Sequence, residues 1–375
     1  MTSTKRIICI VAMMIVILGP LTISVSAEPC YPSTPLEAYT MQYLTRTVPG
    51  IGLLQTSPGM HVILAGTGQP WYDSIRNPQS IAVIAGGKFL LFDTGDGCTK
   101  TLDKLNLPIN LIDNVFLTHY HSDHTSDLGQ LINHTWVNGR QQPIHVYGPE
   151  NVQDLTKGFA EAAKLDIDIR AGALETLDPE LAVGVPHEFI YPEDGSPVEI
   201  YSENGVVVKA FKNDHYDVEI SVGYRIEYAG RVVVISGDTI YCQSVIDNSA
   251  GADLLIHEAT NHVMAERAAC LAETLLGPQG QSLALRIRRA ISHHIDTIEV
   301  ADVAAQAGVN RLVLTHIIPP IPETFMGVDF EAAFMAGMSE IYTGPIDIVK
   351  DADSFYLPPA PSTNINGPCV GPCAP

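Results

Sequence analysis

Short runs of Val, Ile, Leu and Phe recur along the chain, and each ends abruptly at a glycine, an aspartate or a histidine. Apolar runs of this length, bounded by turn-forming residues, are typical of buried strands. We expect strands within 61–68, 88–97, 113–121, 143–150, 230–239, 252–260 and 311–317.

Longer helix-like segments separate these runs. Helices are expected over 125–137, 152–164, 265–276, 282–292 and 297–307. Strands that alternate with helices predict sheets covered by helices, which is an α/β sandwich. No internal repeat of the kind that marks solenoids or propellers is visible in the sequence.

The N-terminus has the pattern of a secretory signal peptide. Lys5 and Arg6 precede an unbroken apolar run at 7–18, and small residues end at Ala27, where we expect cleavage. The run is shorter than the roughly 20 residues that a membrane span needs. We therefore expect a secreted or periplasmic protein with no stable membrane anchor. The expected segments are a signal peptide at 1–27, a leader at 28–44, one domain at 45–358 and a flexible Pro- and Gly-rich tail at 359–375.

Acidic residues outnumber basic ones by 42 to 21, which gives a formal net charge of −21. Nucleic-acid binding depends on Lys and Arg side chains that displace counterions from phosphates. A chain of this charge repels polyphosphate backbones, so we expect no nucleic-acid partner.

Six cysteines remain after signal cleavage, and an even number in an exported chain permits up to three disulfides. Buried cysteines such as Cys98 and Cys270 are alternatively free core thiols. The six are Cys30, Cys98, Cys242, Cys270, Cys369 and Cys373.

The segment FLTHYHSDHTSDLG, residues 116–129, joins an expected strand to an expected helix. His119 and His121 project to the same side of extended backbone and can bind one metal ion, while Asp123 and His124 face a second. Imidazole and carboxylate groups suit zinc. The alternative is a polar surface loop that is rich in histidine.

Four ligands cannot complete two metal sites, and three further candidates occur downstream. Asp238 and His316 each end an apolar strand, where α/β folds place functional side chains. His215 lies in the segment KNDHYDVEISVGYRI. Considered singly, Asp238 could equally be a turn residue and His316 a buried structural histidine.

The order of these motifs resembles the metallo-β-lactamase superfamily, in particular the branch that contains the tRNA 3′-processing endonucleases and the related zinc arylsulfatases. The resemblance covers about residues 60–320 and implies an αββα sandwich. It rests on GTG (66–68), FDTGDG (92–97), THYHSDH (118–124), HYDVEISVGYRI (215–226), SGDT (236–239), HEAT (257–260), His294 with Thr297, and THI (315–317).

The resemblance also implies a ligand set for two zinc ions per chain. Asp238 would bridge the two ions, which together supply a nucleophile at neutral pH because they lower the pKa of bound water to about 7. One zinc would be held by His119, His121 and His215, and the other by Asp123, His124 and His316.

Catalytic roles follow from the same resemblance. Asp123 would orient the nucleophile or take its proton, and His294 would protonate the leaving group. The pair in SHHID is ambiguous, but Thr297 lies three residues after His294, as in the family. Glu258 would orient His294.

Departures from related branches narrow the expected substrate. Asp238 argues against β-lactam hydrolysis, and His121 argues against the diiron oxidoreductases. The tRNA nucleases carry a basic arm between their GYRI-like and GDT motifs, whereas this chain has no room for one at 223–239. We therefore expect an exported dizinc hydrolase of a small-molecule sulfate or phosphate ester. The alternatives are a lactonase or carboxylic esterase, and a non-catalytic metal-binding or scaffold protein; the sequence leaves a homodimer open.

A basic cluster lies in the long stretch between HEAT and His294. It consists of Arg286, Arg288 and Arg289. It is either a solvated helix face or part of a lid that binds an anionic group.

Overall fold

The computed structural model describes residues 35–172, 177–322, 324–325 and 327–361. The chain divides into two units, residues 1–46 and 47–375. In the first, the described element is helix α2 (Pro35–Thr45), within the segment expected to be a leader. The expected signal peptide lies outside the described residues, and so does the tail from residue 362 onward. No helix among the described residues is long and apolar enough to cross a membrane.

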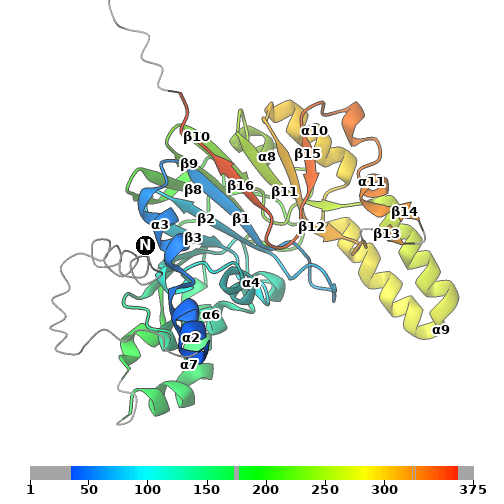
Figure 1. Ribbon diagram of the computed structural model, residues 1–375. Coiled ribbons are helices and arrows are strands. Elements are labelled where there is room, and N and C mark those ends of the chain that lie inside the picture. The colour runs from blue at the N-terminus through cyan, green and yellow to red at the C-terminus, as the bar shows by residue number, and fades with distance from the viewer. Residues whose placement is uncertain (1–34, 173–176, 323, 326, 362–375) are drawn as a thin grey trace, which may run out of the picture. The chain divides into compact units, whose positions relative to one another are not determined.

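Two seven-stranded mixed sheets form the centre of the second unit (Figure 1). The strands of the first sheet, in spatial order, are β16 (Ser354–Leu357), β1 (Met60–Gly66), β2 (Ser80–Ala85), β3 (Lys88–Phe92), β4 (Asn114–Phe116), β5 (Ile144–Gly148) and β6 (Gly184–Glu188). Those of the second are β15 (Ile346–Ile348), β12 (Leu312–Ile318), β11 (Leu254–Thr260), β10 (Arg231–Ile235), β9 (Val222–Tyr228), β8 (Val206–Lys212) and β7 (Val198–Glu203). A small hairpin joins β13 (Thr324–Phe325) to β14 (Val328–Asp329).

Each sheet contains a block of parallel strands. In the first sheet β3, β4, β5 and β6 are parallel, and in the second β10, β11, β12 and β15 are parallel. Parallel strands bring their carboxyl ends to the same edge of a sheet, where side chains of the following loops can meet. Every run that we expected to contain a strand does contain one.

The described helices of the second unit are α3 (Val48–Thr56), α4 (Cys98–Lys104), α5 (Ser122–Thr125), α6 (Leu128–Val137), α7 (Val152–Arg170), α8 (Gln243–Asn248), α9 (His262–His293), α10 (Thr297–Ala307) and α11 (Phe330–Phe334). The predicted helix 297–307 is confirmed, with Asp296 and Glu299 forming a capping box at its start. The helices expected at 265–276 and 282–292 together form α9, which is kinked at Gly277. Figure 1 shows α9 as a hairpin of two helices.

Apolar side chains pack in three layers. The inner faces of the two sheets pack against each other, and Phe92 and Phe116 stack there at 4.9 Å between ring centroids. The outer face of the first sheet packs against α4 and α6, with Leu102 and Leu131 buried between them. The outer face of the second packs against α8 and α10. This order of layers confirms the predicted αββα sandwich.

The cysteines within the described residues are free thiols. Cys98 is buried, as expected for a core thiol, and its thiol donates to Asp127 Oδ2 at 3.3 Å. Cys270 is exposed rather than buried, and its thiol donates to Glu266 Oε1, one turn earlier in α9, at 3.5 Å. Cys30, Cys369 and Cys373 lie outside the described residues, so a disulfide among them stays a prediction.

Candidate metal centre

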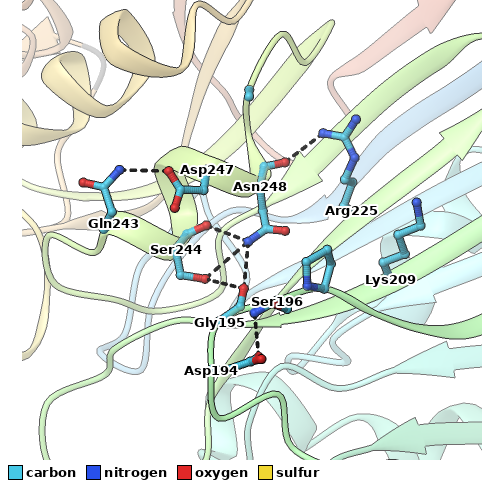
Figure 2. Close-up of a pocket in the computed structure, with 11 residues that line it drawn as sticks. Asp194, Gly195, Ser196, Lys209, Arg225, Gln243, Ser244, Asp247 and Asn248 are labelled. Atoms are coloured by element: carbon cyan, nitrogen blue, oxygen red, sulfur yellow. Dashed lines mark hydrogen bonds between the residues drawn. The ribbon is translucent and has the colours of Figure 1, made fainter.

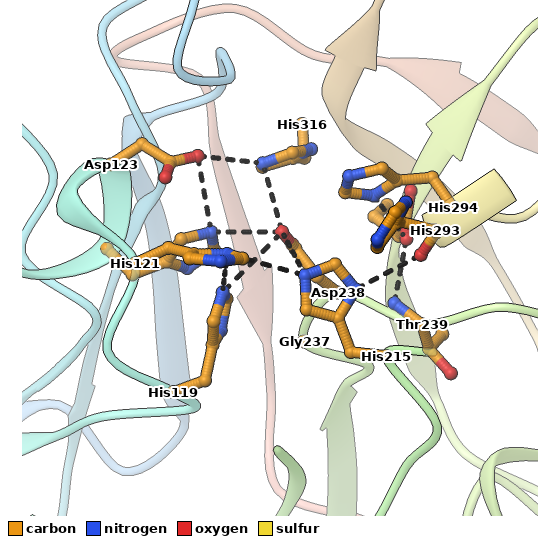
Figure 3. A network of polar contacts seen from close by, with 12 residues as sticks. His119, His121, Asp123, His215, Gly237, Asp238, Thr239, His293, His294 and His316 are labelled. Carbon is orange, nitrogen blue, oxygen red and sulfur yellow. Dashed lines mark hydrogen bonds and ion pairs between the residues drawn. The ribbon is translucent and has the colours of Figure 1, made fainter. Parts of the chain in front are cut away.

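Seven side chains that the sequence singled out as metal ligands converge at one edge of the sandwich (Figure 3). They come from both sheets: His119 and His121 follow β4 of the first sheet, whereas Asp238 follows β10 of the second. The remaining members are Asp123 and His124 in α5, His215 after β8, and His316 in β12.

The first group of donor atoms consists of His119, His121, His215 and Asp238, all within 4.8 Å of one another. His119 Nε2 lies 2.9 Å from His121 Nδ1, and His215 Nε2 lies 3.4 Å from the same atom. Asp238 Oδ2 is 3.9 Å from both His119 Nε2 and His215 Nε2. These three imidazoles therefore face a common point beside the carboxylate.

The second group consists of Asp123, His124, His316 and Asp238. Asp238 Oδ2 lies 3.2 Å from His124 Nε2 and 3.3 Å from His316 Nε2. Asp123 Oδ2 lies 3.2 Å from His316 Nε2. Asp238 thus belongs to both groups, as a bridging ligand must.

The chemistry of these donors fits divalent metal ions. His124 Nε2 is buried close to the carboxylates of Asp238 and Asp123 but forms a well-aligned hydrogen bond with neither, although buried polar atoms are usually satisfied. Burial lowers the pKa of His119, and it lowers the pKa of His215 to about 4. Both imidazoles are therefore neutral at pH 7 and keep a lone pair, which a metal ligand requires.

A glycine fixes the approach of Asp238 to this cluster. Gly237 has a positive φ of 63°, a conformation that side chains other than glycine rarely adopt. A Cβ added there would lie 2.6 Å from the carbonyl oxygen of Val222 and 2.8 Å from Asn213 Nδ2. A larger residue would therefore displace the backbone that carries the shared carboxylate.

Asp93 supports the second group and was not among the residues we selected from the sequence. Its Oδ2 accepts a hydrogen bond from His124 Nδ1 at 2.8 Å, and its Oδ1 accepts one from the backbone N–H of Thr118. A carboxylate of this kind fixes the tautomer and orientation of a ligating histidine. The available signal was FDTGDG, in which Asp93 directly follows an apolar strand.

His294 and Glu258 lie next to the cluster and form an ion pair. His294 Nδ1 donates to Glu258 Oε1 at 2.9 Å, and the ring of His294 stacks on that of His316 at 5.2 Å. Burial of His294 disfavours its charged form and lowers its pKa. The attraction of the Glu258 carboxylate is stronger than this effect of burial, and the pKa of His294 is raised to about 9. The backbone N–H of Thr239 holds the same carboxylate oxygen at 2.7 Å.

The neighbouring His293 is directed elsewhere. Its Nε2 lies 2.7 Å from Asp217, and its backbone carbonyl accepts a hydrogen bond from His215 Nδ1. Its ring meets the ring of His215 edge-on, at 6.1 Å between centroids, so neither ring nitrogen is directed at the cluster. Of the two histidines in SHHID, His294 is therefore the one whose ring lies beside the candidate ligands, where a proton donor would be needed.

The arginines of α9 offer no support for a lid that binds anions. Arg288 donates to both Glu266 and Glu273, so it joins the two halves of the hairpin, and Arg286 contacts Ser282 one turn away. These contacts favour the alternative of a solvated, internally paired helix face.

A second group of cations lines a hollow of about 600 Å³ on the second sheet (Figure 2). Lys209 and Arg225 both pair with Glu227, and Arg225 also donates to the carbonyl of Asn248. None of the seven candidate ligands lines this hollow. It is therefore separate from the metal centre.

Comparison with known proteins places this site in a family. The profile of the Beta-lactamase superfamily domain matches residues 89–317. The chain is 33% identical over 264 residues to a ribonuclease Z of Mycobacterium sp. strain KMS, which covers 70% of this chain and 85% of that protein. It is 29% identical over 305 residues to a ribonuclease Z of Mycobacterium bovis BCG, covering 80% and 99%.

Solved structures share the fold at lower identity. The metallo-beta-lactamase fold protein YhfI from Bacillus subtilis superposes with a TM-score of 0.55 at 20% identity. The match covers 80% of this chain and 99% of YhfI. The short form of human tRNase Z gives a TM-score of 0.55 at 21% identity, covering 79% and 98%.

These relatives contradict our expectation of a small-ester hydrolase without a nucleic-acid partner, because the curated relatives are ribonucleases. The net charge of −21 does not predict the substrate because it is a sum over the whole chain. Bound metal ions are often the largest local charges in a site, and they can bind a phosphate inside an acidic protein. The expectation of a metal-dependent hydrolase acting on ester bonds is confirmed. The chain belongs to the metallo-β-lactamase superfamily, in the branch that contains ribonuclease Z.

Proposed function

We propose that this protein is a metal-dependent ribonuclease that hydrolyses RNA phosphodiester bonds with two zinc ions per chain. The observation that carries the proposal is the pair of ligand groups that share Asp238, in a chain that aligns with ribonuclease Z over 70% of its length. Paired metal sites of this kind are suited to in-line displacement at phosphorus.

Seven ligands would hold the ions: His119, His121 and His215 in one group, Asp123, His124 and His316 in the other, and Asp238 in both. When bound, the ions would supply a nucleophile at neutral pH and neutralise charge on the phosphate.

Asp123 would act on the attacking water. Burial opposes ionisation of Asp123, but His124 beside it holds the pKa of the carboxyl well below its usual range. An ionised carboxylate can orient a water and accept its proton. Asp123 also lines a hollow that opens beside the cluster, so substrate can reach it.

His294 would protonate the departing ribose oxygen. A pKa of about 9 means that the ring carries its proton at pH 7, as a general acid must before the bond breaks. Glu258 would act as a positioning residue, because its hydrogen bond to Nδ1 directs Nε2 of the same ring away from it.

The structure also constrains how RNA is held. Strand β9 ends at Tyr228 and β10 begins at Arg231, so the connection is a tight turn with no space for the basic arm of the tRNA nucleases. The expectation that this arm is missing was correct, although the conclusion against RNA was wrong. Substrate would have to be bound by surfaces nearer the metals.

The test is cleavage of defined RNAs by purified, zinc-loaded protein. Substrates are a 5′-labelled tRNA precursor with a 3′ extension and an unstructured RNA oligonucleotide, and aryl sulfate and lactone serve as comparison substrates. We expect RNA cleavage that is abolished by Asp238→Asn. Efficient sulfate-ester or lactone hydrolysis without RNA cleavage would contradict the proposal.

A further inference from the structure

Two hollows open on the candidate metal centre. One of about 270 Å³ borders His119 and His121, and one of about 340 Å³ borders Asp123. A polymeric substrate needs space on both sides of the bond that is cut. The second hollow also borders Tyr72, whose side chain is 92% exposed.

The loop that carries Tyr72 is held firmly, although Tyr72 itself is exposed. The carboxylate of Asp351 accepts hydrogen bonds from the backbone N–H groups of Thr67 at 3.0 Å and Asn77 at 2.8 Å, near the two ends of the loop. The buried guanidinium of Arg76 donates to the carbonyls of Ile321 and Val349.

The residue before Tyr72 is anchored as well. The Trp71 side chain packs against an apolar cluster of α9 that includes Ala265, Ala269 and Ile287. The Trp71 backbone N–H donates to Gln69 Oε1 at 2.7 Å. The exposure of Tyr72 is therefore a fixed property of an ordered loop. Because the loop is already ordered, a ligand that contacts Tyr72 does not have to order it, which limits the conformational entropy lost on binding.

The carboxylates that line the second hollow disfavour binding of a phosphate there. Asp73, Asp96 and Asp123 line it, and the lining cation, Arg76, is 2% exposed and bound to backbone carbonyls. A phosphate would meet carboxylates here. A nucleobase is uncharged, has a flat face for Tyr72, and carries amino and imino donors that a carboxylate can accept.

We propose that Tyr72 stacks on a nucleobase adjacent to the scissile phosphodiester and so restricts the enzyme to RNA that is unpaired at the cleavage site. A base within a duplex is already stacked on its neighbours and cannot lie on a tyrosine ring. This inference rests on the proposed ribonuclease function and adds the class of substrate.

The experiment compares wild type with Tyr72→Ala on two RNA oligonucleotides that differ only at the cleavage site. One is a normal single strand, and the other is abasic at the nucleotides flanking the cleavage site. Tyr72→Ala should lower kcat/KM on the normal strand by about ten- to a hundredfold, which is the usual effect of removing one base–aromatic stack. It should leave the rate on the abasic strand unchanged.

Two further variants control for structure. Tyr72→Phe keeps the stacking face and should restore most of the activity. Tyr356→Ala removes a half-exposed tyrosine on β16 that borders neither hollow at the metals, and it should leave RNA cleavage unchanged. A wild-type enzyme should also cleave the single strand much faster than the same sequence in a duplex.

The outcomes distinguish the proposed role of Tyr72 from the proposed ribonuclease function. If wild type cleaves RNA and Tyr72→Ala has no effect, or slows the normal and abasic strands equally, the role of Tyr72 is wrong while the ribonuclease function stands. Equal cleavage of duplex and single strand also overturns the inference. If wild type cleaves no RNA, the proposed function fails and the inference fails with it.

Discussion

Asp238 Oδ2 lies 3.2 Å from His124 Nε2, although Asp238 follows a strand of one sheet and His124 follows a strand of the other. The two halves of the sandwich must therefore pack correctly before the candidate metal centre exists. Burial opposes ionisation of Asp238, but His124 and His316 beside it hold the pKa of its carboxyl well below the usual range. The shared carboxylate is thus charged and ready to bind metal at neutral pH.

The two ligand groups should be separable by mutation. His316→Ala removes a ligand of the second group only, so we expect zinc content to fall from two ions per chain to about one. Zinc can be measured by elemental analysis after extensive dialysis. His134→Ala is a matched control, because that histidine lies on α6 and belongs to neither group. Two tightly bound ions in His316→Ala would contradict a second metal site that contains His316.

Loss of the proposed general acid should depend on the leaving group. His294→Ala should retain both metals but lower the rate of RNA cleavage by roughly 10²–10⁴-fold, the usual contribution of a positioned acid. The loss should be smaller for bis(4-nitrophenyl) phosphate, whose nitrophenolate departs without a proton. His293→Ala, one residue away, should stay close to wild type because its ring nitrogens contact Asp217 and the carbonyl of Arg289 rather than the cluster. Equal losses on both substrates would argue against an acid at His294.

The charge of Glu258 should set the alkaline limit of activity. The carboxylate raises the pKa of His294 to about 9, so wild type should retain the protonated acid up to about that pH. Glu258→Gln keeps an acceptor for His294 but removes the charge, which lowers the pKa of the ring. The alkaline limb of the kcat/KM profile for RNA should therefore move to lower pH, with metal content unchanged. An unshifted limb would show that Glu258 does not act through His294.

Much of the fold could be predicted because its strands are short, strongly apolar and bounded by turn residues. Helix 297–307 was predicted to the residue, since Asp296 and Glu299 mark its start and Gly308 its end. Strands such as β7 (Val198–Glu203), which lies at a sheet edge and is mostly exposed, carry a weaker apolar signal and were not predicted.

The candidate ligands could be predicted because four of them lie within six residues and the others end apolar strands. Asp93 could not be assigned in the same way, because its hydrogen bond to His124 depends on the parallel pairing of β3 with β4. Tyr72 was missed because exposure and a hollow are properties of the folded chain. The substrate was mispredicted because net charge does not describe the local field at a metal site.

Zinc titration of metal-free protein, followed by cleavage of a single-stranded RNA, tests the central claim most directly. The shared position of Asp238 predicts that cleavage rises with added zinc and reaches its plateau at two equivalents per chain. Asp238→Asn should show no such rise. RNA cleavage that persists without metal, that reaches its plateau at one equivalent, or that is absent at two equivalents would contradict a dizinc ribonuclease.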